Sequence, residues 1–110
     1  MGGQKLSAQK RRAAYAWIAQ HADLLAERDC AVSVDAFGCI KIQCFAVFGG
    51  LSDAEYIADA IGAVPDWSRS RVVDGDAFVN WAHVGAAHVE IGVILPQMPA
   101  SHIAPWAVTK

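Results

Sequence analysis

The pattern that most constrains the fold is a pair of alternating runs on either side of Gly38. Apolar residues occupy every second position of residues 30–35, and an extended pattern resumes over residues 39–48. A two-residue loop at Phe37 and Gly38 would set the apolar residues of one run against polar residues of the other. A three-residue loop, residues 36–38, with the glycine in the left-handed conformation, matches apolar with apolar. The sequence therefore predicts a β-hairpin with the pairs Val34–Ile40, Val32–Ile42 and Cys30–Cys44 on one face and Ser33–Lys41 on the other.

Two helical patterns flank this hairpin. Ser7 can cap a first helix that runs to about Arg28. Its apolar positions recur at helical spacing and are Ala14, Trp17, Ile18, Ala22 and Leu25. Residues 52–55 read Ser-Asp-Ala-Glu, which is a capping box at the start of a second helix. Gly62 and the following Pro65 end that helix.

Three extended segments follow the second helix, at residues 68–73, 77–84 and 88–95, with an Asp-Gly turn at 74–75. The order α-β-β-α-β-β-β predicts an α+β fold: a single antiparallel sheet of about five strands with two helices packed on one face. We expect residues 1–95 to form one domain. Residues 96–110 contain three prolines and are expected to form an extended tail without regular structure.

The capped first helix, the valine–isoleucine hairpin, the helix at residues 51–61 and the closing strands at 77–95 resemble small uncharacterised proteins encoded by actinobacteria and their phages. Alanine fills 21 of 110 positions and asparagine only one, a bias that also resembles the products of a GC-rich genome. The resemblance implies this fold and this source. No catalytic motif accompanies it.

Composition narrows the function. Apolar residues make up 55% of the chain and charged residues 18%, which indicates a folded domain and not a disordered segment. No signal peptide or membrane-spanning run is recognisable, and three cysteines without a CxxC motif are typical of a reducing compartment, so we expect a cytoplasmic protein without a membrane partner.

The net charge of −2 does not favour nucleic-acid binding. Weak binding remains an alternative through two groups of basic residues. They are Lys5, Lys10, Arg11 and Arg12 at the start of the first helix, and Arg69 with Arg71 on one strand.

Two imidazoles and a carboxylate near Gly85 are the candidate metal ligands: His83, His88 and Glu90. A two-residue loop at residues 85–86 would make the histidines cross-strand partners, and the preference of glycine for such turns favours it. A three-residue loop would separate them and would set Trp81 against Ile91, which the apolar pattern favours. We expect no metal, cofactor or catalytic residue. An enzyme or ligand-binding domain that uses the two histidines is the alternative.

The sheet carries more apolar residues than two helices on one face can cover. Those predicted to form an interaction surface are Phe45, Val47, Trp81, Ile94 and Trp106. The tail, a second copy or another protein could supply the cover. The sequence therefore predicts a non-enzymatic protein-interaction domain, namely a phage or mobile-element accessory protein that binds and inhibits a host protein, including a defence component.

Overall fold

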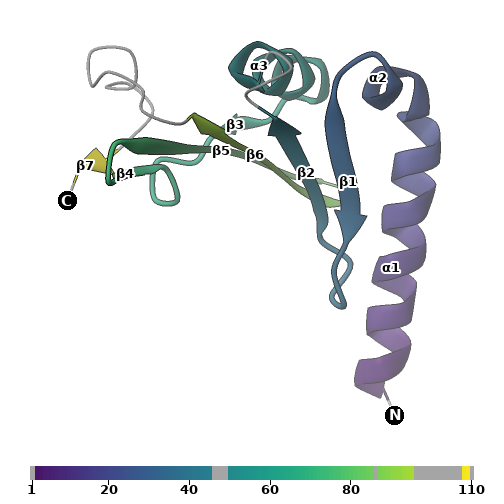
Figure 1. Cartoon of the computed structure of the whole chain (residues 1–110). Coiled ribbons are helices and arrows are strands. Elements are labelled where there is room, and N and C mark those ends of the chain that lie inside the picture. The colour runs from purple at the N-terminus through teal and green to yellow at the C-terminus, as the bar shows by residue number, and fades with distance from the viewer. Residues whose placement is uncertain (1, 46–49, 86, 96–107, 110) are drawn as a thin grey trace.

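The computed structural model describes residues 2–45, 50–85, 87–95 and 108–109. Three helices and seven strands lie in these residues (Figure 1). The helices are α1 (Gly2–Gln20), α2 (Ala22–Ala26) and α3 (Gly50–Ile61). The strands are β1 (Cys30–Val34), β2 (Ile40–Phe45), β3 (Val64–Pro65), β4 (Arg71–Val73), β5 (Asp76–Val84), β6 (His88–Leu95) and β7 (Val108–Thr109). The α+β class is confirmed, with one more helix than the sequence predicts.

The strands form one mixed sheet in the order β1-β2-β6-β5-β4-β7, and β3 also pairs with β5. Most neighbouring strands are antiparallel, but β2 runs parallel to β6, and β4 runs parallel to β7. The prediction of a purely antiparallel sheet is wrong because β6, the strand with the most continuous apolar face, lies between β2 and β5. Its buried side chains are Val89, Ile91, Val93 and Leu95. The chain between β2 and β6 includes α3, which supplies the long crossover that a parallel pair needs.

The apolar pattern sets the register of both hairpins. β1 pairs with β2 as predicted, with Val34 opposite Ile40, and Gly38 has the left-handed φ of 84° that the loop requires. β5 and β6 adopt the longer of the two loops that the sequence left open, so Trp81 lies opposite Ile91. The shorter loop would have turned one strand's apolar side chains away from the core, and their burial outweighs the turn preference of glycine.

The first predicted helix is two helices in the structure. α1 begins at Gly2, so Ser7 lies inside the helix and does not cap it. His21 separates α1 from α2; its ring stacks on Trp17 at a centroid distance of 3.9 Å, and its Nδ1 lies 2.7 Å from the Trp17 carbonyl oxygen. α3 begins at Gly50, so Ser52 of the predicted capping box likewise lies in the first turn.

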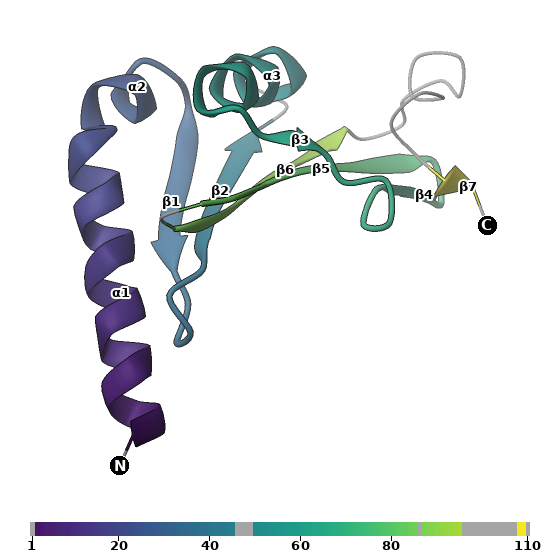
Figure 2. The same ribbon diagram turned by 180° about the vertical axis from the view of Figure 1, so that it is seen from behind.

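The helices are not placed side by side over the sheet. α3 lies over its centre, whereas α1 lies alongside β1 and runs past the end of the β1–β2 hairpin (Figures 1 and 2). Side chains from all three helices join one core with the facing strands. The helical contribution to this core is Ala14, Trp17, Leu25, Ala54, Ile57 and Ala58. The prediction of two helices packed on one face is therefore replaced by three helices in two positions.

A short bulge separates β3 from β4, both of which pair with β5. Ser70 is buried in it. Its hydroxyl donates a hydrogen bond to the Asp66 carbonyl oxygen at 2.9 Å and accepts one from the backbone N–H of Asn80 at 3.0 Å. The predicted strand at 68–73 therefore begins only at Arg71. The bulge positions Arg69 beside Glu90 of β6.

Two residues of the predicted tail are described, Val108 and Thr109, and they pair with β4 as β7. The prediction that residues 96–110 lack regular structure is wrong for this pair because β4 offers it a free edge. The other residues of that segment lie outside the described residues. Among the described helices, none combines the length and the apolar character needed to cross a membrane.

Candidate functional site

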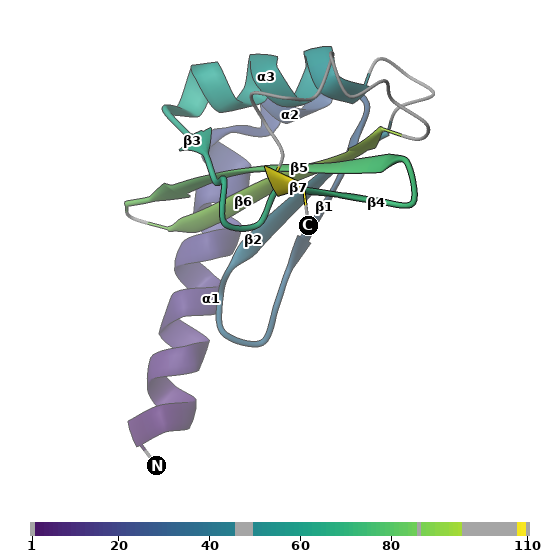
Figure 3. The ribbon, with the colours of Figure 1, turned by 90° about the vertical axis from the view of Figure 1, so that its left-hand side faces the viewer.

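The second face of the sheet carries no described helix over β2, β6 and β5 (Figure 3). The strand registers sort the side chains of this uncovered face into rows that cross the strands. The apolar row is Phe45, Ile94 and Phe78, and Arg71 continues it on β4. The next row is Gln43, Gly92 and Asn80. The charged row is Lys41 and Glu90 with Ala82.

The apolar row is open to solvent. Phe45 is 41% exposed and Ile94 is 43% exposed, and they are direct partners on β2 and β6. Phe78 is half-buried, and the guanidinium of Arg71 lies 5.3 Å from its ring centroid. The predicted exposure of Phe45 and Ile94 is therefore confirmed.

The other predicted members of the interaction surface have different outcomes. Trp81 is only 4% exposed and belongs to the core face, because the β5–β6 register places it opposite Ile91. The prediction that it is an interaction residue is wrong. Val47 and Trp106 lie outside the described residues.

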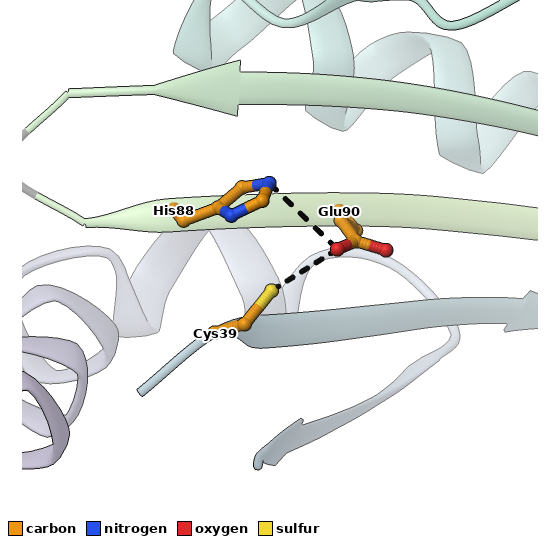
Figure 4. A group of neighbouring side chains, drawn as sticks. All are labelled: Cys39, His88 and Glu90. Atoms are coloured by element: carbon orange, nitrogen blue, oxygen red, sulfur yellow. Dashed lines mark hydrogen bonds and ion pairs between the residues drawn. The ribbon is translucent and has the colours of Figure 1, made fainter. Parts of the chain in front are cut away.

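Glu90 is the centre of a cluster on the uncovered face. Its Oε1 accepts a hydrogen bond from Lys41 Nζ at 3.0 Å and another from the Arg69 guanidinium. Its Oε2 accepts a hydrogen bond from Cys39 Sγ at 3.3 Å and lies 3.7 Å from His88 Nε2 (Figure 4). The side chain of Glu90 is only 13% exposed. The two oxygens are thus divided, one toward the cations and the other toward the sulfur and the imidazole.

The environment favours a charged Glu90 beside a neutral Cys39. Burial of the Glu90 carboxyl raises its pKa, but hydrogen bonds from Lys41 and Cys39 and the charges of Lys41 and Arg69 outweigh that effect, and the pKa lies below its ordinary value. Burial, the hydrogen bond to Glu90 and the Glu90 charge raise the pKa of the Cys39 thiol to about 11. In this environment the Cys39 thiol is therefore protonated, and it acts as a hydrogen-bond donor and not as an activated nucleophile.

A cleft of about 380 Å³ opens next to this cluster. It lies where α1 meets the ends of both hairpins. Its lining is Lys10, Ala13, Phe37, Gly38, Cys39, Val84, Gly85, Ala87 and His88. Two members of the Glu90 cluster, Cys39 and His88, therefore also form part of the cleft wall.

A second cleft of about 300 Å³ lies at the other end of the uncovered face, next to the apolar row. It is lined by Ser68, Arg69, Arg71, Phe78 and Asn80. The cations that reach solvent here are Arg71, which is exposed, and Arg69 and Lys41, whose side chains are 51% and 41% exposed. Glu90, which contacts the last two, is only 13% exposed. Of the nearby aspartates, Asp66 and Asp76 are half-buried and Asp74 is exposed.

Only two of the three candidate metal ligands come together. His88 and Glu90 are neighbours on the uncovered face, whereas His83 lies opposite Val89 on the core side of the sheet. The hypothesis that His83 and His88 are cross-strand partners is therefore wrong, because they lie on opposite faces of the sheet. The third neighbour is Cys39. Sequence patterns could not place it beside β6, because the contact depends on the parallel pairing of β2 with β6.

The basic residues of α1 serve different contacts. Arg11 donates a hydrogen bond to the Ala36 carbonyl oxygen at 2.8 Å and so holds the β1–β2 loop. Lys10 lines the first cleft, and Arg12 is exposed. The side chain of Lys5 lies outside the described residues. These contacts do not form a single basic surface within the described part of α1.

Comparisons of the chain with protein-family models, with curated proteins and with solved structures find no match.

Proposed function

We propose that this chain is a non-enzymatic protein-interaction domain that uses its uncovered sheet face to bind an acidic surface of a partner protein. The observation that supports this most directly is the apolar row, exposed at Phe45 and Ile94, beside a cleft lined by Arg69 and Arg71. The partner that fits carries an apolar side chain for the row and carboxylates for the arginines.

The physical basis is a small apolar anchor combined with directional charge. Covering the exposed parts of Phe45 and Ile94 is worth about 1 kcal/mol each, because complete burial of such side chains gives roughly 1.5–3 kcal/mol. Arginine adds bidentate hydrogen bonds to carboxylates, and aromatic residues and arginine are enriched at protein interfaces. The exposed cations Arg69 and Arg71 also attract an acidic partner before contact.

The resemblance to proteins of actinobacteria and their phages gives this partner a biological context. We propose that the domain is an accessory protein in the cytoplasm that binds and inhibits a host protein, including a component of host defence. A second copy of this chain, or a nucleic acid, is the competing occupant of the face.

The test is capture of a partner by variants of the full chain. Ile94→Glu places a carboxylate in the centre of the apolar row, and Tyr15→Glu makes the same kind of change on α1, where Tyr15 is 60% exposed. Wild-type protein and the Tyr15 variant should capture the same protein from a host lysate after cross-linking. The Ile94 variant should reduce that capture at least tenfold while its circular dichroism spectrum stays unchanged.

A second variant tests the charge of the partner. Arg71→Glu should weaken the same interaction. The wild-type interaction should also weaken progressively as the salt concentration is raised. Equal capture by wild type and Ile94→Glu would refute the proposed face. A mass by light scattering that doubles with concentration and returns to one chain in Ile94→Glu would assign the face to self-association, and a nuclease-sensitive complex would assign it to nucleic acid.

A further inference from the structure

Three different metal-binding atoms converge at the end of the sheet where the first cleft opens. Cys39 Sγ and His88 Nε2 lie 3.3 Å and 3.7 Å from the same oxygen, Glu90 Oε2. All three ligand atoms lie within 4.8 Å of one another. Ligand atoms held tetrahedrally at about 2.0–2.3 Å from a zinc ion lie roughly 3.3–3.7 Å apart, so two of the three separations already match a shared ion.

We propose that Cys39, His88 and Glu90 form a binding site for Zn²⁺. Sulfur, imidazole nitrogen and carboxylate oxygen are the three donors that zinc takes in proteins, and three protein ligands leave its fourth position open. Binding replaces the hydrogen bond from Cys39 Sγ to Glu90 Oε2: the sulfur–zinc bond forms, and the proton that the sulfur carried is released to the solvent. This site lies on the same uncovered face as the proposed interaction surface, and Arg69 contacts both.

The remaining contacts of Glu90 fit the role of a ligand held by one oxygen. Lys41 and Arg69 both bind Oε1. Oε2 is left to face the sulfur of Cys39 and the imidazole of His88 (Figure 4). Hydrogen bonds of this kind orient a ligating carboxylate. The same two cations repel a divalent ion, so the affinity is set by the balance between orientation and repulsion.

The cleft gives the ion access and a free coordination position. Cys39 and His88 belong to the ligand cluster and also line the cleft of about 380 Å³, together with Lys10. A water molecule can reach the fourth position from this side. His88 has a half-exposed side chain, so its ring can move toward Cys39 without disturbing the core.

The test is a titration of the full chain with Co²⁺, which takes the zinc geometry and is visible in absorption. The protein is prepared without a histidine tag and kept reduced. We expect one Co²⁺ per chain, with the absorption of tetrahedral Co²⁺ and a sulfur-to-cobalt charge-transfer band, and we expect Zn²⁺ to abolish both. Cys39→Ser should remove the charge-transfer band. His88→Ala removes a ligand and should weaken binding by at least the about 10- to 100-fold that loss of a hydrogen-bond partner of a ligand costs.

Matched controls use the cysteine and the histidine that face the other side of the sheet. Cys30→Ala and His83→Ala should leave the spectrum and the affinity unchanged. Less than half an equivalent of bound metal in the wild type would overturn the proposal, as would equal losses in Cys30→Ala and Cys39→Ser. In either case the cluster is a hydrogen-bond network only.

Discussion

Gly38 is the residue at which the β1–β2 hairpin meets α1. Its φ is 84°, and a Cβ built on it would lie 2.7 Å from the backbone carbon of Lys10. The backbone of α1 therefore packs directly on the glycine, and Arg11 fixes the same contact through the Ala36 carbonyl oxygen. The position of Lys10 in the first cleft depends on this approach.

We predict that Gly38→Ala lowers the free energy of unfolding by about 2–4 kcal/mol, because left-handed backbone strain adds to the displacement of α1. Gly62→Ala is the matched control: its φ is 75°, but nothing lies within 4 Å of its Cβ. It should cost only the strain, about 1–2 kcal/mol. Urea denaturation of both variants measures the difference, and equal losses would show that α1 does not rest on Gly38.

Sequence patterns predict which face of the sheet a side chain lies on better than they predict which side chains it contacts. The alternation around Gly38 correctly placed Val34 opposite Ile40. The same kind of pattern favoured the register that buries Trp81, but the turn preference of Gly85 favoured the other, and the sequence left both open. It could not show that Cys39 lies beside Glu90, because 51 residues separate them in the chain and no local signal encodes a parallel contact.

At the scale of elements, Glu90 connects three segments that are distant in the sequence. Lys41 comes from β2, Glu90 from β6 and Arg69 from the bulge before β4. The bulge is held by Ser70, whose hydroxyl bridges to the Asn80 amide on β5. The charged contacts therefore join β2 and the β3–β4 edge across the two strands between them.

These contacts predict a pH dependence of stability. The pKa of Glu90 is lower in the folded protein than its ordinary value of 4.5. The carboxylate therefore stabilises the fold above that value, and the contribution is lost as the pH falls through the lower, folded pKa. Glu90→Gln should reduce the free energy of unfolding by about 1–2 kcal/mol at pH 7, a range that allows for the exposure of Lys41 and Arg69.

The difference between Glu90→Gln and wild type should shrink as the pH is lowered from 5 toward 3, because both side chains are then uncharged. Urea denaturation at each pH measures it. Asp59→Asn, an exposed change on α3 outside the cluster, is the control for acid effects in general. A deficit in Glu90→Gln that stays constant down to pH 3 would show that the lost contacts do not depend on charge.

The longer elements were predictable, but the short strands β3 and β7, the separate helix α2 and several helix and strand ends were not. β6 occupies the predicted residues 88–95, and the first two strands pair as expected. The helix starts at Ser7 and Ser52 were wrong because a capping residue can also lie inside a helix when the preceding residues continue it. The bulge at 66–70 was not predicted because it is held by hydrogen bonds of the Ser70 hydroxyl to the Asp66 carbonyl oxygen and the Asn80 backbone N–H. The contact with Asn80 on β5 is not local in the sequence.

For the whole molecule, the order of strands is the feature that local patterns could not reveal. Antiparallel hairpins follow from alternation and turn residues, whereas the insertion of β6 between β2 and β5 depends on which apolar strands bury best together. That insertion determines which side chains are neighbours on the uncovered face, because it places Phe45 opposite Ile94 and Lys41 opposite Glu90. Both proposed sites therefore result from one non-local pairing.

The same topology predicts how stability is distributed over the molecule. β6 pairs along most of its length with β2 on one side and β5 on the other. The N-terminal part of α1 runs past the hairpin (Figure 1), and Leu6 there is 52% exposed. Hydrogen exchange should be slowest at β6 amides, by about 100-fold or more relative to residues 6–9, because those residues precede the contacts of Lys10 and Arg11 with the hairpin and can open without disturbing the sheet.

Mass spectrometry of deuterium uptake at two protein concentrations checks this distribution and connects it with the proposed face. If the chain acts alone until it meets an acidic partner, the uptake of α1 and of β2 should not change with concentration. Protection of Phe45 and its neighbours that rises with concentration would instead indicate a second copy on the apolar row. Equal protection of α1 and β6 would contradict the assignment of the sheet centre as the most stable part of the fold.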